Sequence, residues 1–509
     1  MASNINTYTT ENRGRGLLLI LLFSLALYQF YAAGFNAFAI ICMSPILVLL
    51  VYGAFTWKMA TFWALIFINY FLQFFGKQQW LPGGIPMSLY NELLELVLIA
   101  IVIIDSRETP HFERIQNLMF LTLLGWCAFC TLEVFNNSCN LGLDVGGWYT
   151  GARMMAFQLM YAFLVFTLYL TTPDRLMTYI RIWAILSLFS VFWTWKQIHM
   201  GFTSAENYWM ETVGKSTHIL NGGTLTRYFS THNDAATYGI NAAAAAVVFI
   251  VIGITTKIKR DRLFFLVSSV LIIWGMFQSG TRTALFCLIL GIMVFLVLSK
   301  SVKIVVPSVI LGGIVLVLLI FTNIGNSNQQ IRRMRSAFNE GDASSNVRAI
   351  NQDAIRKYLR DAPWGIGLGA SFDNVPANNK YNKLSKIPPD SEYVFIWVHT
   401  GIVGITTFII LTAMMFVGAC WVVFSRIKNR SLMGVGAGLC GAFAAIQLGG
   451  YGNQVLMQFP NCLIFYGGLA IVYTLPCIEP AWVEIEEKLL IEKKERQRRK
   501  LEKKKASRV

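Results

Sequence analysis

The sequence predicts an all-α, polytopic integral membrane protein with about 12–14 transmembrane helices and a large loop outside the membrane. Of its 509 residues, 55% are hydrophobic and only 14% are charged, whereas a soluble protein carries about 25% charged residues. Apolar segments of about 20 residues, the length that a helix needs to cross ~30 Å of hydrocarbon, recur along the chain. These segments are too long and too continuous for the alternating strands of a membrane barrel.

The apolar segments predict about fourteen spans, and the first two are separated only by a short break at Gly34–Asn36. In chain order, the predicted spans are 17–33, 37–56, 59–75, 88–104, 115–134, 152–170, 177–197, 232–254, 262–278, 283–299, 303–322, 402–424, 433–452 and 460–476. The polar segments divide the chain into N-terminal transmembrane helices (1–322), a large loop (323–401), C-terminal transmembrane helices (402–478) and a charged tail (479–509).

Positively charged residues in the short loops predict the orientation, because Lys and Arg concentrate on the cytoplasmic side. With the N-terminus in the cytoplasm, the inside loops contain sixteen such residues: Arg13, Arg15, Lys58, Arg107, Arg114, Arg175, Arg181, Lys257, Lys259, Arg260, Arg262, Lys300, Lys303, Arg426, Lys428 and Arg430. The outside short loops contain six: Lys77, Arg153, Lys196, Lys215, Arg227 and Arg282. This bias places both termini in the cytoplasm and the large loop on the outer face.

The net charge of +16 does not indicate a nucleic-acid partner, because the positive residues are spread over cytoplasmic loops, the large loop and the tail. The tail contains eleven Lys or Arg and seven Glu. Pairs such as Glu484 and Lys488 lie four residues apart, which predicts a charged surface helix. We expect this helix to meet anionic membrane lipids, and docking of a partner protein is the alternative.

The nine cysteines show no metal-ligand spacing, and the chain has no P-loop and no GxGxxG motif. The sequence therefore predicts neither a metal ion nor a cofactor. Cys130 and Cys139 flank the outer end of the fifth predicted span. They would form a disulfide in an oxidising compartment, and two separate thiols are the alternative.

Arg282 is the first candidate site residue, in the segment FQSGTRTALFCLIL between two adjacent spans. A charged side chain at such a junction is costly in lipid and is therefore a functional candidate. An interface anchor that reaches to the lipid headgroups is the alternative. Ser279, Gly280 and Thr281 predict a tight polar turn that would bring backbone donors to the same place.

A second group of candidates precedes the eighth span, in the segment TRYFSTHNDAATYG. A helix N-terminus attracts anions, and Arg227 would add a positive charge beside it. Ser230 or Thr231 as the N-cap would explain the polar run without any ligand. His232 and Asp234 are further candidates, for which a structural role is the leading interpretation.

The large loop is far longer than the usual connection of ~4–6 residues, so we expect it to be functional. Its segment Arg348–Trp364 has helical character and should end near Pro363. Gly365, Gly367 and Gly369 follow, and they predict either a tight loop over a ligand or a plain turn.

The end of the large loop carries two carboxylates, Asp390 and Glu392, directly after Pro388–Pro389. They are candidates for acid–base chemistry because the chain re-enters the membrane here. The structural alternative is that Asp390 or Ser391 caps the next helix. For His399, which follows in the same segment, the structural interpretation leads.

Arginines at the outer face with carboxylates near the membrane boundary suit a polyprenyl diphosphate substrate. Guanidinium groups match phosphate in bidentate geometry and keep their charge. A carboxylate can take the proton from an attacking sugar hydroxyl. Arginines would stabilise the negative charge that develops on the leaving diphosphate, and no metal is then required.

Four motifs in order resemble the O-antigen ligase/polymerase superfamily of bacterial membrane glycosyltransferases. They are TRYFSTHNDAATYG, SGTRTAL, the run from Arg348 to DAPWGIGLG, and SEYVFIWVHTGIVG, and together they cover about residues 220–425. The resemblance implies an inner-membrane protein with a periplasmic catalytic loop and an undecaprenyl-diphosphate-linked glycan as donor. It implies that Arg227 and Arg282 hold the diphosphate. We place Arg348, His232 and Asp234 in the same substrate site and count Arg282, with Asp390 and Glu392, among the catalytic candidates.

The resemblance also bears on the branch of the superfamily. Its ligases typically carry a His near the end of the loop as the base, whereas this chain has Asp390 and Ser391 there. An acidic residue at this place favours the polymerase branch. Asp390 is then the predicted base or acceptor-positioning residue, with Glu392 as the second choice.

The sequence therefore predicts a polymerase of lipid-linked oligosaccharide repeats of O-antigen, capsule or exopolysaccharide. Membrane lipids and a chain-length regulator are its expected partners. A ligase that moves glycan to lipid A core or protein is the first alternative. A lipid-linked glycan transporter is the rival from another class, with Glu92 and Glu95 as a membrane carboxylate pair. The sequence shows neither the inverted repeats nor the broken helices typical of transporters.

Overall fold

Helices form nearly all the secondary structure in this computed structural model. The structure describes residues 48–81, 86–105, 111–220, 223, 225–322, 329–335, 343–371 and 373–506, together with 21, 23, 24 and 28. The predicted spans 17–33 and 37–56 therefore lie largely outside the described residues.

The described helices are α3 (Lys58–Lys77), α4 (Ser88–Ile104), η1 (Phe112–Ile115), α5 (Leu118–Leu132), η2 (Glu133–Phe135), α6 (Val145–Ala152), η3 (Arg153–Phe157), α7 (Gln158–Tyr169), α8 (Pro173–His199), α9 (Ser204–Trp209), η4 (Met210–Gly214), α10 (Lys215–His218), α11 (Ala235–Thr255), α12 (Lys259–Gln278), α13 (Arg282–Leu298), α14 (Val302–Phe321), α15 (Gln329–Arg335), α16 (Ala343–Leu359), η7 (Leu384–Lys386), α17 (Glu392–Trp421), η8 (Val422–Arg426), α18 (Arg430–Gly452) and α19 (Asn461–Ala506). The strands β1 (Ile219–Leu220) and β2 (Leu225–Thr226) pair antiparallel, with Ile219 opposite Thr226.

Nine segments of the described chain are long and apolar enough to cross a membrane, which confirms the predicted all-α, multi-pass class. They are Lys58–Lys77, Leu118–Phe135, Val145–Tyr169, Pro173–His199, Ala235–Thr255, Lys259–Gln278, Glu392–Arg426, Arg430–Gly452 and Asn461–Leu489. Helices α4, α13 and α14 lie where the sequence predicts three further spans. With 17 residues each, α4 and α13 are about 26 Å long at 1.5 Å per residue.

Helix α17 begins at Glu392, ten residues before the predicted span 402–424. Gly401 interrupts this helix with a φ of 64°. A Cβ added there would lie 2.1 Å from the carbonyl oxygen of Pro363, so only glycine fits. Residues 392–400 thus form a helical segment of their own, before the part of the helix that the sequence assigns to the membrane.

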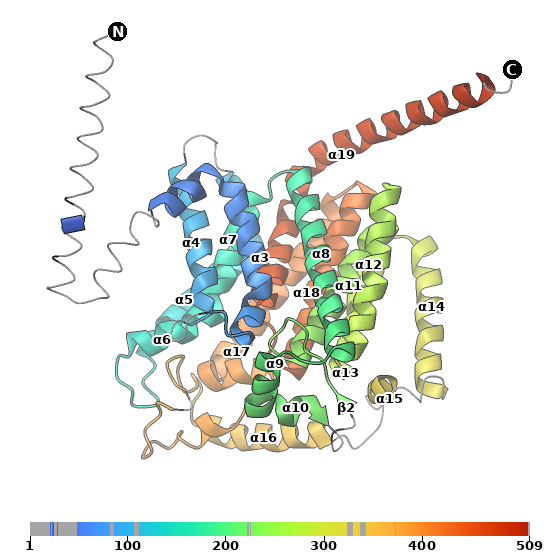
Figure 1. The fold of residues 1–509 in the computed structure, drawn as a ribbon. Coiled ribbons are helices and arrows are strands. Elements are labelled where there is room, and N and C mark those ends of the chain that lie inside the picture. The colour runs from blue at the N-terminus through green and yellow to red at the C-terminus, as the bar shows by residue number, and fades with distance from the viewer. Residues whose placement is uncertain are drawn as a thin grey trace, which may run out of the picture.

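The two ends of the helix bundle are covered differently (Figure 1). Helices α9, α10, α15 and α16 lie at one end, which we call the loop face, and α16 runs across it. Helix α19 begins at the loop face and extends well beyond the opposite end, which we call the tail face. The polar segments on both sides of α11–α14 therefore gather at the same end of the molecule.

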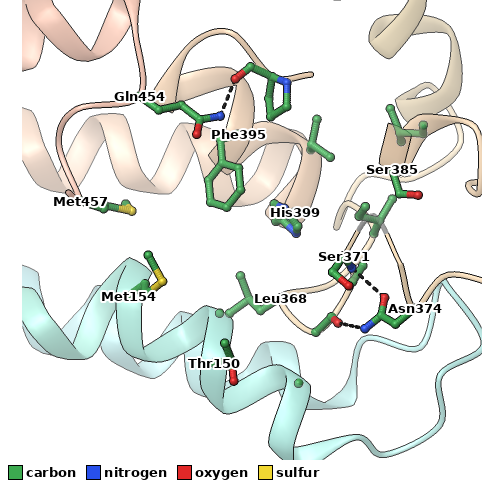
Figure 2. Close-up of a pocket in the computed structure, with 18 of the residues that line it drawn as sticks. Thr150, Met154, Leu368, Ser371, Asn374, Ser385, Phe395, His399, Gln454 and Met457 are labelled. Carbon is green, nitrogen blue, oxygen red and sulfur yellow. Dashed lines mark hydrogen bonds between the residues drawn. The ribbon is translucent and has the colours of Figure 1, made fainter. Parts of the chain in front are cut away.

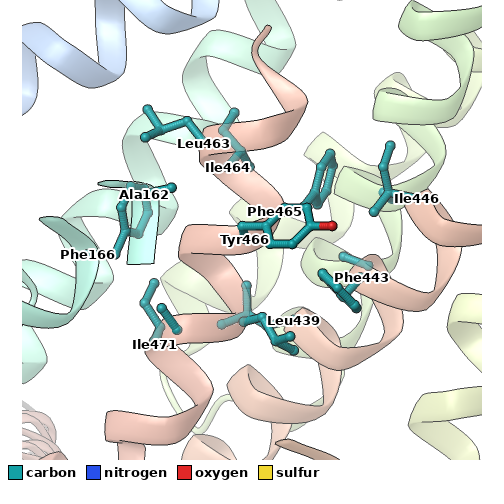
Figure 3. Packing of buried hydrophobic residues seen from close by; sticks show 14 of the residues in the cluster. Ala162, Phe166, Leu439, Phe443, Ile446, Leu463, Ile464, Phe465, Tyr466 and Ile471 are labelled. Carbon is teal, nitrogen blue, oxygen red and sulfur yellow. The ribbon is translucent and has the colours of Figure 1, made fainter. Parts of the chain in front are cut away.

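Small residues let the central helices pack closely. Every residue of the run Ala242–Ala246 in α11 is buried. A Cβ added to Gly441 of α18 would lie 2.5 Å from the carbonyl oxygen of Gly291 in α13. Where larger side chains meet, the rings of Phe443 and Tyr466 pack edge to face with centroids 5.3 Å apart (Figure 3). Such close contact matters in lipid, where van der Waals packing is a main source of helix association.

Candidate functional site

The turn between α12 and α13 is the meeting point of two arginines from distant parts of the chain. Arg227 donates from Nε to the carbonyl oxygen of Ser279 at 3.3 Å and from Nη2 to Oγ1 of Thr281 at 3.1 Å. Arg333 of α15 donates from Nε to the carbonyl oxygen of Gly280 at 2.6 Å. The turn therefore fixes two guanidinium groups at the loop face.

Arg282, Arg333 and Arg348 lie close enough to Arg227 for their charges to affect its pKa, and we call these four residues the arginine cluster. Burial lowers the pKa of Arg227 to about 10, and the positive charges of the other three arginines act in the same direction. The carboxylate of Asp234 opposes this shift. Among the described residues, four guanidinium groups and one carboxylate gather here, a composition that suits an anionic ligand.

Three members of the cluster are residues that the sequence singles out, namely Arg227, Arg282 and Arg348. The fourth, Arg333, is missed by the sequence analysis. It lies in a run of three arginines around a buried Met334, and its neighbour Arg332 is exposed. Neighbouring residues of a helix point in different directions, so the helical register of this short run is the signal that would have distinguished Arg333 from Arg332.

Asp234 lies beside the cluster as the N-cap of α11. Its Oδ1 accepts a hydrogen bond from the backbone N–H of Thr237 at 2.8 Å. This corrects the expectation that Ser230 or Thr231 caps the helix. Both are buried, and the Ser230 hydroxyl donates instead to the carbonyl oxygen of Ser190 at 2.6 Å.

His232 is buried and lies away from the guanidinium groups, between the rings of Tyr70 and Tyr238 at 5.7 and 5.3 Å. Its carbonyl oxygen accepts a hydrogen bond of 2.9 Å from Nζ of Lys77. The Lys77 ammonium also lies 3.8 Å from the ring centroid of Phe229. Lys77 thus connects α3 to the segment that contains Arg227. From the sequence, Lys77 is only one of the positive charges of the outer loops.

Helix α16 brings two predicted site residues together. Arg348 and Asn351 are three residues apart and share one face of this helix. The Asn351 amide donates to Oδ2 of Asp390 at 2.9 Å. The same helix therefore contributes a guanidinium group to the cluster and holds the carboxylate of Asp390.

The start of α17 is fastened to the loop between α18 and α19. Ser391 is at the N-cap position, but its hydroxyl donates to the carbonyl oxygen of Gly450 at 3.1 Å rather than capping the helix. The buried Glu392 accepts a hydrogen bond from the backbone N–H of Leu456 at 3.0 Å. Gln454 donates to the carbonyl oxygen of Pro389.

A cavity of about 530 Å³ opens beside Glu392, between α6, the glycine-rich loop, α17 and the loop before α19 (Figure 2). Glu392, Phe395 and His399 line it as one stripe of α17, at positions i, i+3 and i+7. In Figure 2, Phe395 and His399 project from α17 toward Leu368 and Met154.

The glycine-rich loop forms one wall of this cavity because Gly401 interrupts α17. The carbonyl oxygen of His399, close to the interruption, accepts from the backbone N–H of Gly367 at 2.9 Å. In return, Nδ1 of His399 lies 3.0 Å from the carbonyl oxygen of Gly367. Gly365 and Gly367 have φ angles of 74° and 91°. The glycines therefore form a tight loop at the cavity wall, and the ligand that this loop would cover stays a prediction.

Gln458 connects the cavity to the surroundings of the arginine cluster. It lines the cavity, and its Oε1 accepts from Asn233 Nδ2 at 3.2 Å and from Thr237 Oγ1 at 3.0 Å. The same Thr237 hydroxyl lies 3.0 Å from Oδ2 of Asp234, so its single proton serves one of the two acceptors at a time. The cavity and the cluster therefore share a hydrogen-bond network, and no local pattern in the sequence indicates it.

The remaining sequence candidates lie elsewhere. Glu92 pairs with Arg153 at 3.4 Å and accepts from the Tyr149 hydroxyl at 2.7 Å, whereas Glu95 is completely buried. Cys130 and Cys139 are both free thiols, so the disulfide considered from the sequence does not form in this structure.

Comparison with known proteins identifies a family that one segment of the chain resembles. No curated protein matches the chain. Residues 267–409 match a family model described as O-antigen ligase (Wzy_C). This segment contains Gly280, Arg282, Arg333, Arg348 and the start of α17, whereas Arg227 and Gln458 lie outside it. The match supports the resemblance inferred from the motifs, and residues 267–409 are thus similar to the O-antigen ligase/polymerase superfamily.

Proposed function

We propose that the protein is a membrane glycosyltransferase that polymerises oligosaccharide repeats carried on undecaprenyl diphosphate. The observation that supports this most is the arginine cluster at the loop face. Its charge and its fork-shaped donors suit a diphosphate held at the membrane boundary. The loop face would then be periplasmic, with both termini in the cytoplasm and the protein in the bacterial inner membrane.

In the proposed reaction, a hydroxyl oxygen of the acceptor sugar attacks the anomeric carbon of the donor. A new C–O bond forms, and the bond to the diphosphate breaks with its electron pair leaving on the phosphate oxygen. The arginine cluster stabilises that charge. Asp390 takes the proton of the attacking hydroxyl, and a single displacement inverts the anomeric centre. Neither a metal ion nor a nucleotide sugar is needed.

The base is assigned to Asp390 because α16 holds its carboxylate together with Arg348. Glu392 is the second choice, since its carboxylate lines the cavity but already accepts a backbone hydrogen bond. A ligase that transfers finished glycan to lipid A core or protein is the alternative, which the description of the matching family favours. The expected chain-length regulator and surrounding lipids are partners under either function.

Arg282→Ala and Arg333→Ala test the proposal. Arg332→Ala is the matched control for Arg333→Ala, because Arg332 is exposed on the same helix, α15. We expect the first two variants to reduce transfer by about 10²–10³-fold, and the control to stay near wild type. Initial rates are measured with purified protein in detergent and a synthetic lipid-diphosphate repeat. Equal rates for Arg333→Ala and Arg332→Ala would contradict the assignment.

Surface glycans from cells lacking the gene separate the two alternatives. Loss of the long ladder, leaving one repeat on its final carrier, indicates a polymerase. A long polymer that stays on its lipid carrier indicates a ligase. Loss of surface glycan of every length, together with no transfer in detergent, would contradict both and leave transport as the function to examine.

A further inference from the structure

We propose that the cavity lined by Glu392, Phe395 and His399 binds the terminal sugar of the acceptor glycan, and that His399 accepts a hydrogen bond from one of its hydroxyls. This inference rests on the proposed function, because it names the second substrate site of the same reaction. His399 is here a positioning residue, and the acid–base step stays with the carboxylates.

The lining of the cavity suits a neutral, hydroxyl-rich ligand. Its polar side chains are mostly uncharged hydroxyl and amide groups, namely Thr150, Ser371, Asn374, Ser385, Gln454 and Gln458. Met154, Leu368, Phe395 and Met457 supply apolar surface for the C–H face of a sugar ring. The volume of about 530 Å³ lies within the ~300–1,000 Å³ typical of small-molecule sites. The arginine cluster, by contrast, suits an anion.

Hydrogen bonding fixes the tautomer of His399. Its Nδ1 lies 3.0 Å from the carbonyl oxygen of Gly367, and a carbonyl can only accept. Nδ1 therefore carries the proton in the neutral ring, and Nε2 is left as an acceptor. Among the described residues, Nε2 of His399 has no hydrogen-bond partner. A sugar hydroxyl entering the cavity would supply the missing donor.

Gln458 offers the complementary group. Its Oε1 is occupied by Asn233 and Thr237, and within the described part of the chain its Nε2 makes no hydrogen bond. The cavity thus presents an acceptor on His399 and a donor on Gln458. Two hydroxyls of the bound glycan can satisfy both, because each hydroxyl donates and accepts.

The position of His399 also orients the acceptor toward the arginine cluster. His399 lies seven residues after Glu392 on the same face of α17, which is about 10 Å along the helix axis. A sugar bound between these side chains has one end at His399 and the other at Glu392. Gln458 marks the side nearest the cluster, so the attacking hydroxyl would point toward the donor diphosphate.

Two substitutions at His399 separate its two hydrogen bonds. His399→Asn keeps an N–H that can donate to Gly367 but removes the acceptor at Nε2. His399→Gln places an amide oxygen near the position of Nε2 and should restore binding in part. His199→Ala is the matched control, because His199 is exposed at the end of α8.

Steady-state transfer is measured in detergent with a lipid-diphosphate repeat as donor and a soluble oligosaccharide repeat as acceptor. We expect His399→Asn to raise the acceptor KM about tenfold, the value of one hydrogen bond. The donor KM and kcat should change less than about twofold, and His399→Gln should recover part of the loss. An unchanged acceptor KM in His399→Asn would overturn the inference, while the cluster variants still decide the proposed function.

Acceptor analogues sharpen the test. Of a set of monodeoxy acceptors, one should lose affinity with wild type and lose none with His399→Asn. If wild type shows no transfer, the proposed function fails, and calorimetric titration with the free oligosaccharide then decides whether the cavity binds it. No binding, or equal binding by wild type and His399→Asn, would overturn the saccharide site.

Discussion

Gly280 places two separate constraints at the centre of the arginine cluster. Its φ of 58° disfavours any other residue, and a Cβ would lie 2.8 Å from Oε1 of Gln330 and 3.2 Å from Cδ of Arg333. Gly223 also has a positive φ of 96°, but nothing lies within 4 Å of its Cβ position. Substitutions at Gly280 and Gly223 therefore separate the effect of backbone strain from the effect of displacing the arginine side chains.

Gly280→Ala should therefore reduce transfer by about 10²-fold, because small misplacements of substrate-binding groups have effects of this size. Gly223→Ala should share a backbone strain of about 1–2 kcal/mol and retain nearly the wild-type rate. Both variants are compared by thermal unfolding and by initial rates in detergent. Equal rates would show that displacement of the cluster side chains does not limit the reaction.

The sequence predicts those site residues whose type is unusual at their position. Arg227, Arg282 and Arg348 stand out because charge is rare near membrane spans. Arg333, Lys77 and Gln458 do not, because their importance comes from partners more than fifty residues away in the chain. Such contacts follow from the packing of helices, which one sequence does not encode in any local pattern.

At the scale of elements, the segment from α10 to α11 depends on a neutral His218. Its Nε2 accepts the backbone N–H of Ala235, the first residue of α11, at 3.1 Å. Its Nδ1 lies 3.0 Å from the carbonyl oxygen of Gly214 and so carries the ring proton. Burial lowers the pKa of His218 to about 4, and the charges of Arg227 and Lys77 contribute.

The pH dependence of stability follows from this shift. The unfolded chain takes up a proton on His218 near pH 6.5, whereas the folded protein resists it until about pH 4. Stability is therefore lost as the pH falls through this window, by about 2 kcal/mol between pH 7 and pH 5. His218→Gln should be less stable at pH 7 and should lose less on acidification. Thermal unfolding at both pH values checks this, and parallel losses in the two proteins would contradict it.

The boundaries of the helices show where local sequence patterns are enough to predict the structure. The positions of α11, α12 and α13 follow from long apolar runs, and the sequence places them to within about three residues. The start of α17 does not follow from such a run, because its first turns are stabilised by the loop around Gly365. Only the fold shows that Pro363 and Gly401 touch, and that this contact makes 392–400 a separate helical segment.

At the scale of the whole molecule, α19 connects the two faces. It begins directly after the loop that holds Glu392, crosses the bundle and leaves at the tail face (Figure 1). There, Glu486 accepts hydrogen bonds from Lys257 at 2.7 Å, from Asn429 at 2.9 Å and from the Ser431 hydroxyl. The tail helix is thus anchored to the ends of α11 and α18.

This anchor should contribute to stability without taking part in transfer. Glu486 is 25 residues beyond the start of α19, about 38 Å along the helix from the loop face. Its side chain is 11% exposed, so Glu486→Ala leaves three donors without their acceptor and should cost about 2 kcal/mol of unfolding free energy. Glu484→Ala is the control, since Glu484 makes only an exposed pair with Lys488, and exposed pairs contribute little to stability.

Thermal unfolding in detergent measures the first effect, and kcat of transfer below the unfolding temperature measures the second. We expect Glu486→Ala to unfold at a clearly lower temperature than Glu484→Ala while both keep the wild-type kcat. A lower kcat in folded Glu486→Ala would instead show that the tail face communicates with the loop face. Helix α19 would be the route for that coupling, since it runs without interruption from the loop that holds Glu392 to the tail.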